Sequence, residues 1–213
     1  MIAIIDYRAG NQTSVRRALD CLKIPSLVTG DPQVLREAEG IIFPGVGAAG
    51  QAMEHLNKTG LANEIRALIQ DKRPFLGICL GCQIMLDFSQ ENAVATLGIL
   101  PGQTKRFEPD ILDCEKRPIR IPHMGWNEVK TIKPTVLWEG IGAKDQFYFV
   151  HSYYPEPQPR LTIGLTEHGL EFTSFFGYDG LWAVQFHPEK SGPPGLRILQ
   201  NFYDYCRGRG YAQ

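Results

Sequence analysis

One cysteine of the chain is flanked in a way that suits a nucleophile. A Gly-x-Cys-x-Gly pentapeptide, centred on Cys79, lies between a strand-like run and a helix-like run. A sharp strand-to-helix turn crowds the neighbours two positions away, and Gly77 and Gly81 are small enough to allow it. Cys82 lacks such flanks, because leucine and isoleucine lie two residues to either side. The spacing therefore predicts Cys79 as the nucleophile, with the N–H of Leu80 aimed at an oxyanion and the following helix favouring the thiolate.

A histidine and a glutamate end a second apolar run and can assist that cysteine. Residues 181–186 are strand-like, and His187, a proline and Glu189 follow them. In extended backbone, residues two apart face the same side, so Glu189 can turn toward His187. A carboxylate beside an imidazole fixes its tautomer and stabilises the imidazolium, which a thiol nucleophile needs from its base. His123 and His151 have no acid two positions away.

The two neighbouring cysteines also allow a different reading. Cys79 and Cys82 form Cys-x-x-Cys, a spacing that suits a dithiol redox pair or half of a zinc site. A zinc site needs two more ligands, and the sequence has no second Cys-x-x-Cys and no close Cys-His pair. A thioredoxin-like domain would place the motif near the end of its first strand, in a shorter chain. We therefore expect no metal and no cofactor.

Composition and charge limit the possible partners and compartment. The 213 residues include 22 Lys plus Arg and 23 Asp plus Glu, a formal net charge of -1. This balance gives no electrostatic reason to expect nucleic acid or an anionic membrane as a partner. The N-terminal apolar run stops at Asp6, too early for a signal peptide, and five scattered cysteines argue against a disulfide framework. We predict a soluble, cytoplasmic protein with one domain over residues 1–213.

Alternating strand-like and helix-like segments in the first half predict an α/β fold with a mostly parallel sheet covered by helices on both faces. The second half, with short β-like runs separated by Gly and Pro, predicts antiparallel additions to that sheet. Expected strands are 2–7, 26–29, 40–43, 74–78, 103–107, 119–121, 146–150, 160–166, 171–176 and 181–185. Expected helices are 14–22, one starting at 31–32, 61–70, a helix-like 84–86 and 195–206, with 155–159 as a stiff loop.

The strand-to-helix turn around Cys79, called the elbow below, and the His-Pro-Glu segment lie about a hundred residues apart. They resemble those of the class I glutamine amidotransferases, and the resemblance covers the whole chain. The glycine-rich residues 44–47 match that family's oxyanion loop. Finer segments resemble the branch formed by glutaminase subunits of imidazole glycerol phosphate synthases: Ile4, Asp6, Tyr7, Gly10 and Asn11, then residues 43–48, 122–127, 148–153 and 186–191. Cys82, where an apolar residue such as methionine is commoner, and Ala49 depart from the branch pattern.

The resemblance implies that Cys79 attacks the carboxamide of glutamine and that His187 protonates the departing ammonia, then activates water. It implies an oxyanion hole formed by backbone N–H groups of Leu80, Val46 and Gly47. Glutamine binding is implied for five residues: Gly45, Gln83, Glu91, Ser152 and Tyr153.

The resemblance also implies a partner, a separate cyclase subunit with a (β/α)₈ barrel that receives the ammonia and closes an imidazole ring in histidine biosynthesis. Trp126 is a typical interface residue, with a core position as the alternative. The expected partner-facing residues are His123, Met124, Gly125, Trp126, Asn127 and Lys190. The peptide within residues 44–47 is expected to gate activity by resting with its carbonyl in the oxyanion hole.

Three alternatives remain open at this point. One is a glutaminase that serves a different synthase, for surface-sugar amidation, anthranilate or a purine intermediate. The second is a cysteine hydrolase or stress protein of the same fold that does not act on glutamine. The third is a catalytically dead scaffold, which the intact Cys79, His187 and Glu189 disfavour.

Overall fold

A computed structural model describes residues 1–7, 11–178 and 180–208 of the chain. Gly10, one of the residues in the N-terminal motif, lies outside the described residues. Within them, no helix combines the length and the apolar character that crossing a membrane requires.

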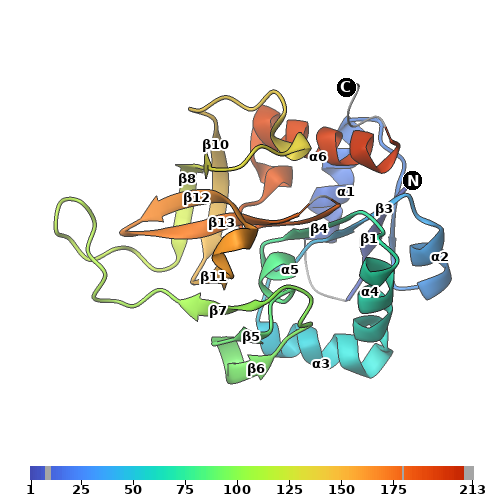
Figure 1. The fold of residues 1–213 in the computed structure, drawn as a ribbon, viewed down its shortest axis with the longest axis horizontal. Helices are drawn as coiled ribbons and strands as arrows, with labels where there is room; N and C mark the ends of the chain where they lie inside the picture. Colours follow the sequence, from blue (N-terminus) through green and yellow to red (C-terminus); the bar gives the residue numbers. More distant parts are fainter. Residues whose placement is uncertain (8–10, 179, 209–213) are drawn as a thin grey trace.

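An eight-stranded sheet forms the centre of the molecule (Figure 1). Its order is β2-β1-β3-β4-β14-β13-β12-β9, and the first five strands pair in parallel. The other three pair antiparallel beyond β14. The predicted fold class is thus confirmed. The strands are β1 (Ile2–Ile5), β2 (Ser26–Thr29), β3 (Gly40–Phe43), β4 (Phe75–Ile78), β9 (Lys130–Thr131), β12 (Thr162–His168), β13 (Leu170–Tyr178) and β14 (Leu181–Val184).

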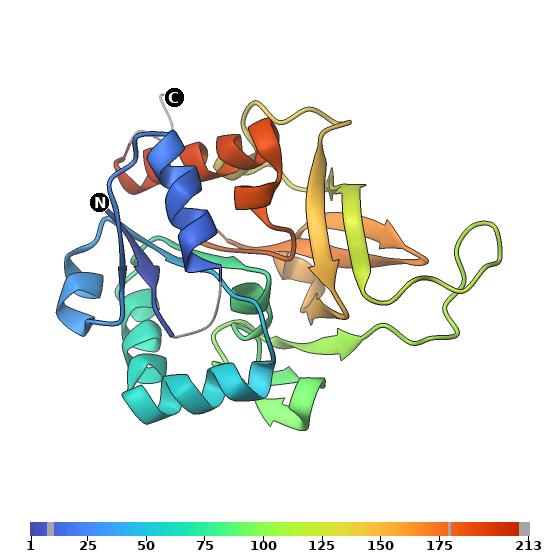
Figure 2. The same ribbon diagram turned by 180° about the vertical axis from the view of Figure 1, so that it is seen from behind.

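Helices cover both faces of the parallel strands (Figure 2). Helices α1 (Gln12–Cys21) and α6 (Gly192–Cys206) pack with the side chains of Ile2 and Ile4 on one face. The alternate residues of the same strand, Ala3 and Ile5, face α2 (Pro32–Glu37), α3 (Ala49–Thr59) and α4 (Leu61–Gln70). All four residues of β1 are buried, as expected for a strand between two helical layers.

Two smaller sheets accompany the central sheet. Strand β10 (Gln146–His151) pairs with β8 (His123–Glu128), and a four-stranded sheet has the order β11-β7-β5-β6. The strands of the second sheet are β5 (Phe88–Ser89), β6 (Val94–Ala95), β7 (Gly102–Arg106) and β11 (Tyr153–Pro157). Short 3₁₀ helices are η1 (Glu91–Ala93), η2 (Val136–Trp138), η3 (Pro159–Leu161) and η4 (Pro188–Lys190).

Two local predictions are wrong, and one strand is missed. Residues 119–121 form no strand, because they follow Pro118 and precede Pro122, which have no N–H to donate, and only a Leu112–Pro118 bridge forms nearby. The predicted loop 155–159 is partly strand, since β11 is an edge strand, where prolines are tolerated. The sequence patterns also miss strand β8 entirely.

Candidate active site

Cys79 occupies a strained turn directly after β4. Its backbone has φ 53 and ψ -109, a conformation that few side chains adopt. A Cβ on Gly77 would lie 2.9 Å from the carbonyl oxygen of Gly81, and a Cβ on Gly81 would lie 1.9 Å from that of Phe43. Gly77 therefore requires glycine for the reason that the Gly-x-Cys-x-Gly spacing indicates, whereas Gly81 requires it because the backbone of β3 approaches closely.

The helix after Cys79 is shorter than predicted. Helix α5 covers only Leu80–Gln83, and residues 84–86 leave the helical path with fully buried side chains. A single turn aligns few peptide dipoles, so the expected stabilisation of the thiolate by a helix N-terminus is correspondingly small. Other groups must supply polar contacts to the sulfur.

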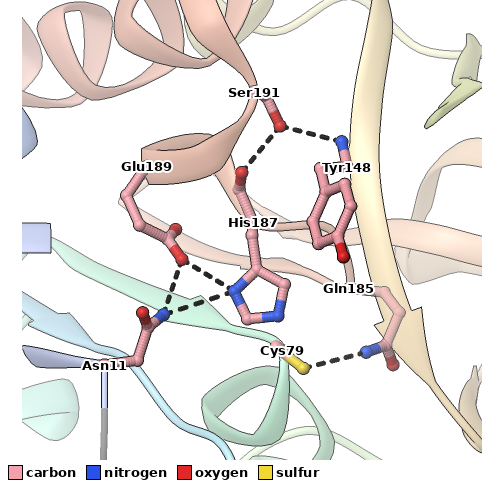
Figure 3. Close-up of polar contacts among 7 residues, drawn as sticks. All are labelled: Asn11, Cys79, Tyr148, Gln185, His187, Glu189 and Ser191. Carbon is pink, nitrogen blue, oxygen red and sulfur yellow. Dashed lines mark hydrogen bonds and ion pairs between the residues drawn. The ribbon is translucent and has the colours of Figure 1, made fainter. Parts of the chain in front are cut away.

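Parallel pairing of β14 with β4 brings the histidine to the cysteine. Val184 pairs with Ile78, so the residues after both strands emerge at the same edge of the sheet. His187 Nδ1 lies 2.7 Å from Glu189 Oε1, and both side chains are fully buried. Figure 3 shows the opposite ring nitrogen, Nε2, turned toward Cys79. The structure thus groups the three predicted residues.

The surroundings of His187 favour its charged form. Burial alone lowers the pKa of His187, but the negative charge of Cys79 and the hydrogen-bonded carboxylate of Glu189 outweigh this effect and raise the pKa to about 10. A histidine that holds its proton beside a sulfur can stabilise a thiolate as an ion pair and later pass the proton to a leaving group.

Two residues that sequence reasoning left without a role hold this pair in place. Asn11 Nδ2 donates to Glu189 Oε1 at 2.6 Å and lies 3.3 Å from His187 Nδ1. Ser191 Oγ donates to the carbonyl oxygen of His187 at 2.6 Å and accepts from the N–H of Tyr148 at 2.9 Å (Figure 3). Asn11 belongs to the N-terminal motif noted in the sequence, and its place in that motif was the feature that could have indicated a role in the site.

The loop of residues 44–47 lies against the elbow. The backbone N–H of Leu80 donates to the carbonyl oxygen of Gly45 at 3.4 Å, so the expected oxyanion donor is already engaged. Gly47 has φ 109, which favours glycine, and a Cβ on Gly45 would lie 2.3 Å from the hydroxyl of Tyr7. A cavity of about 190 Å³, lined in part by Tyr7, Val46, Gly47 and Leu80, borders the loop.

Of the five predicted glutamine-binding residues, Gln83 and Tyr153 contact each other directly. Gln83 Nε2 donates to the carbonyl oxygen of Tyr153 at 2.9 Å. Glu91 Oε2 accepts from the N–H of Ala49 at 2.8 Å, and burial raises the pKa of Glu91 while this hydrogen bond opposes the shift. The carbonyl oxygen of Ser152 accepts from the N–H of Phe107, which leaves it less available to a ligand.

The predicted partner-facing segment divides by strand alternation. In β8, Met124 is 62% exposed and Trp126 is 54% exposed, whereas His123 is only 5% exposed. The expectation that His123 faces a partner is therefore wrong, because alternate residues of a strand point to opposite sides. Asn127 Nδ2 donates inward to the carbonyl oxygen of Glu167 at 2.8 Å. Gly125 is partly exposed, and Lys190 is exposed.

The buried face of β8 carries paired imidazoles. His123 Nδ1 lies 3.0 Å from His151 Nε2, and the ring of His123 stacks on that of His168 with centroids 4.1 Å apart. Burial and the neighbouring imidazole of His168 lower the pKa of His123 to about 3, and burial also lowers the pKa of His151. Among the described residues, no group of three or more His, Cys, Asp or Glu side chains is arranged to hold a metal ion.

Comparisons with known proteins agree with this geometry. The family model "Glutamine amidotransferase class-I" matches residues 3–206. The chain is similar to the "Imidazole glycerol phosphate synthase subunit HisH" of Nitratidesulfovibrio vulgaris strain DP4, with 57% identity over 100% of both chains. It is 46% identical to the protein of that name from Moorella thermoacetica, over 99% of this chain and 98% of the relative. The solved structure of PurLQS from Thermotoga maritima shares the fold, with a TM-score of 0.70, 15% identity, and coverage of 96% of this chain and 97% of that chain.

Proposed function

Because this chain belongs to the class I glutamine amidotransferase family, and within it to the HisH subunits of imidazole glycerol phosphate synthase, we propose that it hydrolyses glutamine and supplies ammonia for imidazole ring closure in histidine biosynthesis. The observation that carries the proposal is the His187–Glu189 pair beside a cysteine held in an elbow. We assign this activity to a single domain over residues 1–213.

The proposed chemistry follows from the positions of the three side chains. The Cys79 thiolate attacks the carboxamide carbon of glutamine, and the carbonyl oxygen becomes an oxyanion. His187, which holds a proton, gives it to the nitrogen as the C–N bond breaks, and ammonia leaves a glutamyl thioester. The neutral imidazole then takes a proton from water, which attacks the thioester and releases glutamate and the thiolate. Glu189 and Asn11 hold the imidazole in the required orientation.

The described conformation is a resting state in this proposal. The Gly45 carbonyl oxygen lies where a negatively charged oxygen would need donors, and it already accepts the Leu80 N–H. Rotation of the peptide between Gly45 and Val46 would replace the carbonyl with the Val46 N–H, completing a hole with Leu80. The flanking cavity of about 190 Å³ gives the loop space for this movement.

The partner in this proposal is a cyclase subunit with a (β/α)₈ barrel. Met124 and Trp126 form an exposed apolar pair on β8. We assign Gly125, Asn127 and Lys190 as further contact residues. Exposed aromatic side chains of this type commonly anchor interfaces. Ammonia would pass directly to the partner, since protonation in water would remove its nucleophilicity. We assign the pair to the cytoplasm, where the free Cys79 thiol stays reduced.

An isotope experiment tests this function. The chain is mixed with the cyclase barrel subunit, the phosphoribulosyl-formimino nucleotide and glutamine labelled with ¹⁵N in its amide, in the presence of unlabelled ammonium. We expect labelled imidazole glycerol phosphate with little dilution. Dilution to the isotope ratio of the bulk solution would contradict channelling, and the absence of any ring product would favour a different synthase as partner. A Cys79→Ala chain serves as the control and should yield only unlabelled product.

A further inference from the structure

A buried glutamine contacts the sulfur of the proposed nucleophile. Gln185 follows β14, two residues before His187, and its side chain is fully buried. Its Nε2 lies 3.5 Å from Cys79 Sγ (Figure 3). Its Oε1 lies 2.8 Å from Gln83 Nε2. The thiol of Cys82, also fully buried, lies 3.9 Å from the same Oε1.

The neighbouring groups decide which end of this amide faces the sulfur. The carbonyl oxygen of Tyr153 can only accept a hydrogen bond, so the side-chain nitrogen of Gln83 must face it. The second proton of that nitrogen then points to Gln185, whose oxygen must accept it. The Nε2 of Gln185 is consequently fixed on the side of Cys79 as a donor. The orientation is set by a backbone carbonyl rather than by the sulfur itself.

We propose that Gln185 is a catalytic residue that donates a side-chain N–H to the sulfur of Cys79 and stabilises its thiolate, with Gln83 as the positioning residue that fixes the donor. This assignment rests on the proposed glutaminase function and deepens it. A hydrogen bond to a charged acceptor is stronger than one to a neutral acceptor, so the donor favours the thiolate over the thiol.

Such a donor acts at two steps of the reaction. Before attack it helps to hold the thiolate that the one-turn helix α5 alone supports weakly. When water attacks the thioester, the electron pair of the breaking C–S bond returns to the sulfur, and the same N–H stabilises the thiolate as it leaves. His187 occupies the other side of the sulfur (Figure 3), so the two donors together fix the direction of attack.

The test measures the thiolate without substrate, so it does not depend on turnover. The rate of alkylation of Cys79 by iodoacetamide is followed from pH 5 to pH 10 in a Cys82→Ala background, with each cysteine peptide resolved by mass spectrometry. Gln185→Met keeps the length of the side chain but removes the donor. We expect the pH midpoint of alkylation to rise by about one unit and the rate of glutamate release at saturating glutamine to fall. Gln70→Met, on the exposed end of α4, is the matched control and should match the parent.

The variants separate the possible explanations. An unchanged midpoint in Gln185→Met, with parental turnover, would show that Gln185 only fills space and would overturn the inference. Should Gln185→Met not fold, Gln185→Glu has nearly the same shape and places a carboxylate oxygen near the sulfur, so its midpoint must rise further; a parental midpoint there would equally overturn the inference. Failure of the proposed function would instead appear in the parent, as normal alkylation of Cys79 without any release of glutamate from glutamine, with or without the barrel subunit.

Discussion

The backbone N–H of Leu80 donates to the carbonyl oxygen of Gly45 at 3.4 Å. Leu80 begins the helix after the proposed nucleophile, and Gly45 belongs to the glycine-rich loop facing it. The donor that should receive an oxyanion is therefore paired with a carbonyl of the same chain. A ligand can change this state only by binding the conformation with a free Leu80 N–H more tightly than the conformation in which the Gly45 carbonyl occupies it.

We predict that the chain alone releases glutamate slowly and that the barrel subunit with its nucleotide ligand accelerates the release strongly. Gly47→Val should reduce this activation, because a β-branched residue disfavours the positive φ of Gly47 and the loop movement around it. Gly60→Val is the matched control: Gly60 also has positive φ and open space around its Cα, but lies between α3 and α4. Glutamate release is measured for the chain alone, with the barrel, and with barrel plus ligand. Equal rates in all three mixtures would contradict the gate.

The two neighbouring cysteines should differ sharply. Cys79→Ala is expected to lower glutamine hydrolysis by at least about 10⁴-fold, as loss of a nucleophile does elsewhere. Cys82→Ala should keep most of the parental rate, because Cys82 is buried beside Gln185 and has no glycines at its flanks. Steady-state glutamate release measures both. Equal loss of activity in the two variants would instead support a dithiol mechanism.

The base should matter more than the residue that orients it. His187→Ala is expected to abolish glutaminase activity. Glu189→Gln should keep an activity at least about 10-fold above that of His187→Ala, because Asn11 still contacts the imidazole. The rate of glutamate release with the barrel present is the measurement. A dispensable His187, with His123 or His151 essential, is the result that would refute the assignment.

The buried imidazoles of His123 and His151 should make the protein sensitive to acid. Their folded-state pKa values are lowered, that of His123 to about 3, so unfolding exposes groups that bind protons more readily. The stability that the two neutral imidazoles contribute is complete above pH 6.5, the ordinary pKa of histidine, and is lost progressively as the pH falls below that value. His123→Phe, which keeps a ring against Phe149, should show a shallower fall in urea midpoint between pH 6.5 and pH 4. His55→Phe, on α3, is the control; a slope in His123→Phe as steep as the parent's would argue against the imidazole pair.

Strand alternation and helix spacing predict most elements of the parallel half, because these patterns repeat within a few residues of the chain. The antiparallel half is harder to predict. Its strand β8 mixes exposed Met124 and Trp126 with buried His123, and the burial of that histidine depends on His151 and His168 from distant segments. Apolar patterning marks a strand by its buried face, and here the buried face is polar.

The sequence by itself determined the elbow and the acid beside the histidine. Crowding between positions 77 and 81 and the two-residue repeat of extended backbone are local constraints, so Cys79, His187 and Glu189 could be selected without a fold. Only the tertiary structure decided that Asn11, 176 residues from His187, reaches the same imidazole, and that Gln185 faces the sulfur. Both follow from the parallel strands β1, β3, β4 and β14, whose ends lie at one edge of the sheet and bring together side chains that no spacing along the chain relates.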